Sequence, residues 1–258
     1  MTSLYFLGGL VFGILLLIIP VVLNNVLKLG ILNKLQKGSA SLLILILIYG
    51  ILLSLAIWQN HLWLTMLTAL LIVGLTCSLS LMRFRFKLKV LLIPALAGLL
   101  SVMLVLAPIS AILITPLPQS FLPQYFLPVV GLLSGLIAYN MVRGIRKYYV
   151  GLQNHAALYN YLLGNGCTHH QAVAYFLRRS LQSTALWVLR RISANMVTTT
   201  PLLLLVLVWA GVPVVKAAIL NFMFFFAILS GSMISLFVAL WVARRYTFDE
   251  YSRLQPVS

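Results

Sequence analysis

The chain has 258 residues, of which 62% are hydrophobic and only two, Asp249 and Glu250, are acidic, against eighteen lysines and arginines. Its apolar runs are too long for a globular core, and its charges are confined to short breaks between them, so the composition indicates a polytopic membrane protein and excludes a soluble domain. The same arrangement argues against a nucleic-acid-binding protein, because a basic binding face needs a soluble domain to present it.

Seven stretches reach the length of about 20 apolar residues that a helix needs to cross the hydrocarbon core. In chain order they are residues 4–27, 41–57, 62–82, 90–116, 121–142, 192–211 and 217–243. We therefore predict an all-α polytopic membrane protein with about seven transmembrane helices, forming a single domain over residues 1–258.

The basic residues divide unevenly between the two sides of these stretches. Seventeen of the eighteen follow the first, third, fifth or seventh stretch, and only Lys216 lies in an alternate connection. Connections rich in lysine and arginine stay on the cytoplasmic side of a membrane. The sequence thus predicts an N-terminus outside and a C-terminus in the cytoplasm.

The connection at 83–89, of sequence RFRFKLK, alternates basic and apolar residues. This alternation fits a short amphipathic strand. A tight basic loop between two spans explains it as well, and this is the interpretation that we favour.

The connection at 143–191 is long enough to hold structure of its own. Residues 151–163 favour a helix that continues from the fifth stretch. Gly164, Asn165 and Gly166 then interrupt it, because glycine and asparagine tolerate the left-handed conformation that ends helices. Thr168 and Gln171 have the spacing of a capping box, which starts a new helix. The apolar residues that recur at helical spacing in this second helix are Ala172, Val173, Phe176, Leu177 and Leu181.

This helix–break–helix pattern has two interpretations, which the spacing does not separate. It forms either an amphipathic hairpin on anionic lipid headgroups, with Arg178 and Arg179 at the level of the phosphates, or a docking elbow for a cytoplasmic partner. The neighbouring His169 and His170 would point about 100° apart on a helix and could not chelate one ion unaided. We take both as solvent-exposed residues at the start of the helix.

Polar residues gather in the sixth stretch, at Asn195, Thr198, Thr199, Thr200 and Pro201. Pro201 removes a backbone hydrogen bond, which neighbouring threonines can replace. The cluster fits either a kinked packing helix or a kink that lines a substrate path. In the seventh stretch, the small residues of segment 230–235 predict a close contact between helices.

The sequence offers no catalytic constellation. It has no GxxxxGK[ST] motif, so the chain cannot bind and hydrolyse ATP by itself in the manner of an ABC ATPase. Both carboxylates lie in the C-terminal tail, which excludes general acid–base catalysis by paired carboxylates. No span interior carries a charge, and this argues against an ion-coupled transporter and against recognition of a bare hard cation. We expect no enzyme activity and no cofactor or metal on this chain.

From about residue 128 to 246 the sequence resembles the permease subunits of the FetB-type iron-export ABC transporters. The likeness is strongest in the segment GCTHHQA at 166–172, where that family has Gly-Ala-Thr-Pro-x-Gln-Ala. Arg178 and Ser180 stand in the place of the family's Arg-x-Ser. The further matching positions are Pro128, Gly131, Gly135, Pro201, Ala210, Gly211, Val215, Lys216 and Ala217.

The acidic residues of that family are replaced around the loop. Asn160 and Tyr161 stand where the family has carboxylates, and Arg179 and Arg190 replace two more. His169 replaces a proline. Because iron ions prefer oxygen donors such as carboxylates, these changes argue against iron as the substrate of this divergent member.

The resemblance implies a permease subunit of the cell's inner or plasma membrane. Two copies would form the translocation path, in contact with membrane lipids, and a separate ABC-type ATPase subunit carrying ATP and Mg²⁺ would drive it. The alternative is an ATP-independent membrane scaffold, or a degenerate family member without transport activity. The residues expected to couple to the ATPase are Gly164, Asn165, Gly166, Cys167, Thr168, His169, His170 and Arg178.

Overall fold

A computed structural model describes residues 22, 32–114, 119–195, 204–205, 207–209 and 211–247. The regular structure in these ranges is entirely α-helical. The chain divides into two compact units, Met1–Ser54 and Leu55–Ser258. Most described residues of the first unit belong to α2 (Leu32–Gln59), a helix that ends just past the boundary.

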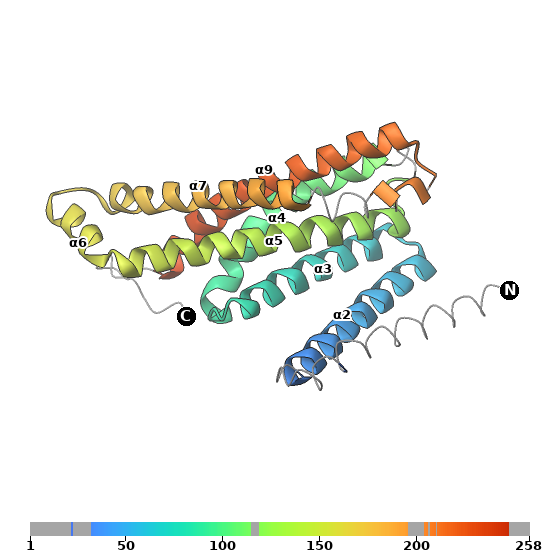
Figure 1. Cartoon of the computed structure of the whole chain (residues 1–258), viewed down its shortest axis with the longest axis horizontal. Helices are drawn as coiled ribbons and strands as arrows, with labels where there is room; N and C mark the ends of the chain where they lie inside the picture. The colour runs from blue at the N-terminus through green and yellow to red at the C-terminus, as the bar shows by residue number, and fades with distance from the viewer. Residues whose placement is uncertain are drawn as a thin grey trace. The chain divides into compact units, whose positions relative to one another are not determined.

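The second unit contains the remaining labelled helices of Figure 1. They are α3 (Leu62–Arg83), α4 (Leu88–Ile114), α5 (Pro123–Asn154), α6 (Ala156–Gly164), α7 (His169–Asn195) and α9 (Val214–Thr247).

Five of the described helices, α2, α3, α4, α5 and α9, are long and apolar enough to cross a membrane. They confirm as long apolar helices the predicted spans at 41–57, 62–82, 90–116, 121–142 and 217–243. Apart from residue 22, the predicted span at 4–27 lies outside the described residues, and so does half of the one at 192–211. The count of seven therefore stays a prediction.

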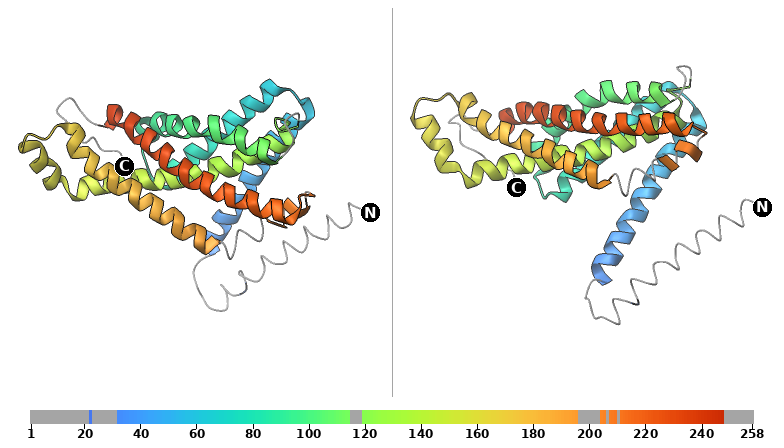
Figure 2. Two further views of the ribbon diagram at one scale, coloured as in Figure 1. Left: turned by 90° about the horizontal axis from the view of Figure 1, so that it is seen from above. Right: turned by 45° about the horizontal axis from the view of Figure 1, so that its top comes forward.

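In the second unit, α4 packs against α9 and α3 packs against α5, while α5 also contacts α4 and α9. Figures 1 and 2 show these four helices side by side, with α7 lying along α5 and α9. Four arginines of this unit lie on α7. Most of its other arginines and lysines lie on one side, at the ends of α3, α5 and α9, at the start of α4 and in the turn between α3 and α4. We call this the basic end. Lys216 lies at the opposite end, near the start of α9.

The contact between α4 and α9 is close enough to require a glycine. A Cβ atom added to Gly98 would overlap the main-chain oxygen of Ser235 and would lie 2.8 Å from the Cβ atom of Ala239. Ser232 and Ser235 are fully buried on α9. The predicted close contact at 230–235 is therefore confirmed, and small residues allow it because they let two backbones approach.

A buried polar pair links α5 to the same stretch of α9. The Asn140 side-chain amide donates a hydrogen bond to the Ser232 hydroxyl over 3.1 Å. Asn140 is 5% exposed and Ser232 is fully buried, so the bond satisfies groups that lipid could not solvate.

The turn between α3 and α4 is tight and not extended. The N–H of Arg85 donates to the Met82 carbonyl at 3.0 Å, and the N–H of Phe86 donates to the Leu81 carbonyl at 3.2 Å. This is the Schellman pattern of a helix end, in which Arg85 takes the left-handed position with φ +59°. The loop interpretation of the 83–89 segment is confirmed, and the strand interpretation is wrong.

The fifth predicted span, at 121–142, is only part of a longer helix. α5 runs without interruption from Pro123 to Asn154, and α6 begins at Ala156 after a break at His155. The sequence predicts continuation of the helix toward residue 163, but not this break. His155 has φ −117° and ψ 36°, which lie outside the helical region and set α6 at a new angle to α5.

Candidate functional site

Residues 165–168 link α6 to α7 and, with Gly164 and His169 at the helix ends, form a sharp elbow beyond the membrane-length part of α5 (Figure 1). Gly166 has φ +81°, the left-handed conformation that side chains disfavour. Its N–H donates to the Leu163 carbonyl at 3.1 Å, and the Cys167 N–H donates to the Leu162 carbonyl at 3.1 Å. These bonds form a Schellman motif, so the predicted break at 164–166 is confirmed.

The predicted capping box restarts the chain as α7. The Thr168 N–H donates to the Gln171 side-chain oxygen at 3.0 Å, and the Gln171 N–H donates to the Thr168 hydroxyl at 3.4 Å. Both bonds satisfy donors that a helix start leaves without an internal partner. The elbow is therefore specified on both sides by local hydrogen bonds, so it does not depend on a partner for its shape.

His169, at the start of α7, contacts α6 across the elbow. The prediction that His169 is solvent-exposed is therefore wrong. The Nδ1 atom of His169 lies 2.8 Å from the Tyr159 hydroxyl of α6, and the two rings meet edge to face. Burial raises the pKa of Tyr159, so its hydroxyl keeps its proton at neutral pH. The prediction failed because residue spacing does not show that α6 folds back onto the start of α7.

Of the residues predicted to couple to a partner, those from Gly164 to His169 lie together at the elbow. Gly164, Asn165, Gly166 and Thr168 are exposed, while Cys167 and His169 are half-buried. Arg178 is also exposed, but it lies nine residues after His169 in α7 and therefore about 13 Å along the helix axis. The side chain of His170 lies outside the described ones.

Protein, not lipid, covers the apolar face of α7. Ala172, Val173 and Phe176 are 0%, 2% and 3% exposed, and α7 contacts both α5 and α9. The Ser180 hydroxyl donates to the Gly144 carbonyl of α5 at 2.8 Å. These contacts contradict an amphipathic hairpin whose apolar face rests on the bilayer, and they connect the elbow to two membrane-length helices.

Arginines and aromatic rings interleave where α3, α5 and α7 meet at the basic end. The Arg143 guanidinium lies 3.9 Å from the centre of the Trp187 ring. Arg191 lies 5.0 Å from Trp187 and 5.3 Å from Tyr139. At these distances a cation is attracted to the face of a ring, so the rings stabilise positive charges in a region where the described residues include no carboxylate.

The sequence analysis did not predict this cluster of arginines and aromatic rings, although the spacing of its residues gives a signal for it. Tyr139 precedes Arg143 by four residues, and Trp187 precedes Arg191 by four, so each pair lies on one helix face. The two faces turn toward one another only in the folded chain, with the Tyr139 and Trp187 ring centres 5.8 Å apart.

The structure tests little of the predicted substrate path. Asn195 is the last residue of α7, and its side chain is not among those described. Thr198, Thr199, Thr200 and Pro201 lie outside the described residues. Within the described ranges, no group of three or more His, Cys, Asp or Glu side chains converges as a metal site would require.

One protein-family model matches this chain, over residues 7–248, and its description reads "Uncharacterised protein family (UPF0014)". Neither the curated proteins nor the solved structures contain a match to the chain.

Proposed function

The chain belongs to the UPF0014 family, a family of ABC-transporter permease-like membrane proteins, and on this premise we propose that it is the permease subunit of an ABC transporter. In this proposal two copies form the translocation path in the inner or plasma membrane. A separate ATPase subunit binds ATP and Mg²⁺ and performs the hydrolysis, so this chain is not itself an enzyme.

The observation that carries the proposal is the capped elbow and its connections. Its fold is fixed by its own hydrogen bonds, and its residues Gly164, Asn165 and Gly166 remain exposed. One arm continues through α6 to α5, and the other is α7, which packs on α5 and α9. A partner that pushes on this surface would therefore act on the membrane-length helices directly.

The orientation follows from the same proposal. With the N-terminus outside, the basic end lies in the cytoplasm, where an ATPase finds its nucleotide. The path-lining role of Asn195, Thr198, Thr199, Thr200 and Pro201 belongs to the proposal as well.

We further propose that the substrate is not a bare metal cation. Both carboxylates of the chain lie at 249 and 250, beyond every predicted span. The basic end would repel a free cation and attract an anion. A neutral, amphipathic or anionic substrate, or a metal carried by an anionic chelator, suits this chain better.

The experiment compares two substitutions of Gly166 in the full chain, purified in mild detergent from cells that produce its candidate ATPase. Gly166 has open space where a Cβ atom would lie, but its φ is positive. Gly166→Val should therefore distort the elbow, because β-branched residues resist positive φ, whereas Gly166→Asn adds a side chain of similar size that tolerates this conformation.

We expect wild type and Gly166→Asn to copurify with an ABC ATPase and stimulate its hydrolysis. Gly166→Val should be produced at the same level but stimulate hydrolysis several-fold less. A chain that purifies alone under several mild conditions and stimulates no ATPase would contradict the proposal and favour an ATP-independent scaffold. Equal stimulation by the two variants would show that the elbow is not the coupling surface.

A further inference from the structure

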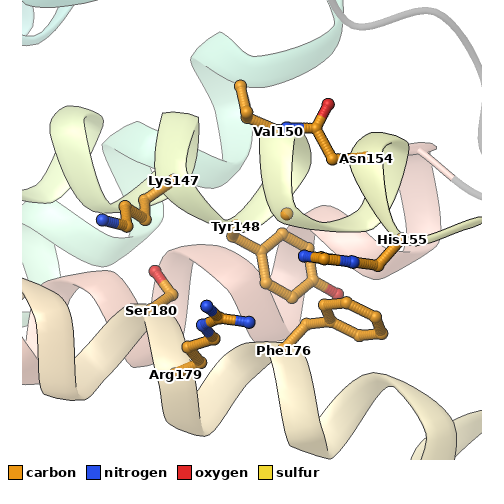
Figure 3. A pocket seen from close by; sticks show the side chains of 9 residues that line it. Lys147, Tyr148, Val150, Asn154, His155, Phe176, Arg179 and Ser180 are labelled. Atoms are coloured by element: carbon orange, nitrogen blue, oxygen red, sulfur yellow. The ribbon is translucent and has the colours of Figure 1, made fainter. Parts of the chain in front are cut away.

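A cavity of about 170 Å³ lies between the end of α5 and the middle of α7 (Figure 3). On the same measure one water molecule needs roughly 15 Å³, so the cavity has room for a polyatomic ligand. In Figure 3 Lys147, Arg179 and Ser180 lie toward one end, and the Tyr148 hydroxyl lies between His155 and Phe176 toward the other.

The Tyr148 hydroxyl is the most informative group in this cavity. Tyr148 is only 2% exposed, and its hydroxyl has no hydrogen-bond partner among the described residues. Its neighbour Tyr149 is equally buried, but its hydroxyl bonds the Thr247 hydroxyl at 3.1 Å. Buried polar groups without a partner are rare in native structures, and an unseen ligand is one of their recognised explanations.

The positive charges around the cavity favour a negatively charged ligand. Lys147 and Arg179 contribute an ammonium and a guanidinium group, and His155 adds an imidazole that can donate hydrogen bonds. The described ranges contain no Asp or Glu, since the two acids are residues 249 and 250. An anion would therefore meet two positive charges and no described carboxylate.

We propose that this cavity binds a phosphate group. The Tyr148 hydroxyl has almost no accessible surface behind His155 and Phe176, so in the bound state the exposed side chain of His155 moves aside. The hydroxyl then donates a hydrogen bond to one phosphate oxygen, and Lys147 and Arg179 neutralise its charge from the other end of the cavity. A tetrahedral phosphate presents oxygens in several directions, which suits donors arriving from both ends, whereas a carboxylate presents only two in one plane. The phosphate comes either from a soluble anion or from the headgroup of an anionic phospholipid.

This proposal does not depend on an ATPase partner, because the site lies within one chain. Its first test uses the purified full chain in detergent and measures the melting temperature in inorganic phosphate and in sodium chloride of equal ionic strength. A ligand that binds only the folded state raises the melting temperature with its concentration.

The decisive variant is Tyr148→Phe, which removes one hydroxyl and little volume. In phosphate-free buffer it should melt at the wild-type temperature or above, because it removes a buried polar group that has no partner. With phosphate present it should bind about tenfold more weakly, since a hydrogen bond to a charged group is lost. Arg179→Gln should also weaken the response strongly.

Two matched variants serve as controls. Tyr149→Phe removes an equally buried hydroxyl that has a partner, so it should lower the melting temperature in both buffers and keep the phosphate response. Lys216→Gln removes one charge at the opposite end of α9 and should also keep the response.

The two sources of phosphate are separated by reconstitution. If the site takes a lipid headgroup, soluble phosphate has no effect, but nanodiscs of phosphatidylglycerol stabilise wild type over nanodiscs of phosphatidylcholine, and Tyr148→Phe loses this difference. The proposal is overturned if neither source stabilises wild type, or if Tyr148→Phe keeps the full response. It is also overturned if Tyr148→Phe lowers the melting temperature in phosphate-free buffer with a detergent that carries no phosphate group, because the hydroxyl would then already have a partner.

Discussion

The contacts α4–α9 and α5–α7 join pairs of helices of similar length in the same unit, but different kinds of residue make the two contacts. Between α4 and α9 the backbones approach so closely that Gly98 has no room for a side chain against Ser235. α5 and α7 also approach closely at Gly144, where an added Cβ atom would lie 2.7 Å from the Thr184 hydroxyl. Elsewhere their contact includes a cavity, arginines stacked on rings, and the hydrogen bond from Ser180 to the Gly144 carbonyl.

The difference follows the surroundings of each pair. Within hydrocarbon, burial of apolar surface does not favour helix association, so contact depends on close packing of small residues. At the basic end, long side chains can reach water and headgroups, and polar or cation–ring contacts replace close packing. The first kind of contact fixes distances between helices. The second leaves space that a ligand can fill.

The sharpest test of this contrast is the same substitution in both contacts. Gly98→Ala forces α4 away from α9 and should lower the free energy of unfolding by about 2 kcal/mol, the cost of overpacking a filled core. Gly151→Ala on α5 places its Cβ atom 3.7 Å from the Phe176 ring, an ordinary contact. It should be neutral or stabilise by up to about 1 kcal/mol, because alanine favours helix over glycine.

Reversible unfolding of the full chain in mixed detergent measures both changes. Equal destabilisation by the two alanines would remove the distinction between a close-packed and an open contact.

The next largest effect concerns the ring-bound arginine of the basic end. A double-mutant cycle with Arg143→Gln and Trp187→Leu should give a coupling energy of about 1 kcal/mol, as expected for a partly exposed cation over an indole ring. The control cycle pairs Trp187→Leu with Arg85→Gln, whose arginine stacks on no ring among the described residues. Coupling of the same size in both cycles would mean that the charge acts at long range and not through the ring.

The smallest effect is expected from the buried hydrogen bond of the membrane-length region. A cycle with Asn140→Leu and Ser232→Ala should give a coupling of about 0.6 kcal/mol, the average for hydrogen bonds between helices in membranes. The variants are compared by unfolding in the same detergent. A value above that of the Arg143–Trp187 pair would reverse our ranking of the two regions.

The positions of the described spans and the elbow could be predicted from the sequence because both signals are local. Hydrophobic length marks a span, and glycine, asparagine and a Thr-x-x-Gln box mark a break and a restart. Each depends on residues within one or two helical turns of one another, such as Gly166 and Thr168.

The pairings between helices could not be predicted in this way. The contact of His169 with Tyr159, the Arg143–Trp187 stack and the cavity around Tyr148 all depend on which helices are neighbours and how each is rotated. Hydropathy shows that α5 is apolar over its length but not which face meets α7. The break at His155 was also hidden, because residues 151–163 favour one helix that continues from the fifth span.

The uninterrupted length of α5 has a mechanical consequence. A helix of 32 residues is about 48 Å long, whereas the hydrocarbon core of a bilayer is about 30 Å thick. Even when α5 crosses the membrane upright, it extends well beyond the hydrocarbon and works as a lever arm. A tilt of about 5° around its far end displaces its last turn sideways by about 4 Å, calculated from the rise of 1.5 Å per residue. A displacement of the elbow by about the length of one side chain thus requires only a small tilt of α5. The packed helices inside the membrane can accommodate such a tilt by small sliding motions.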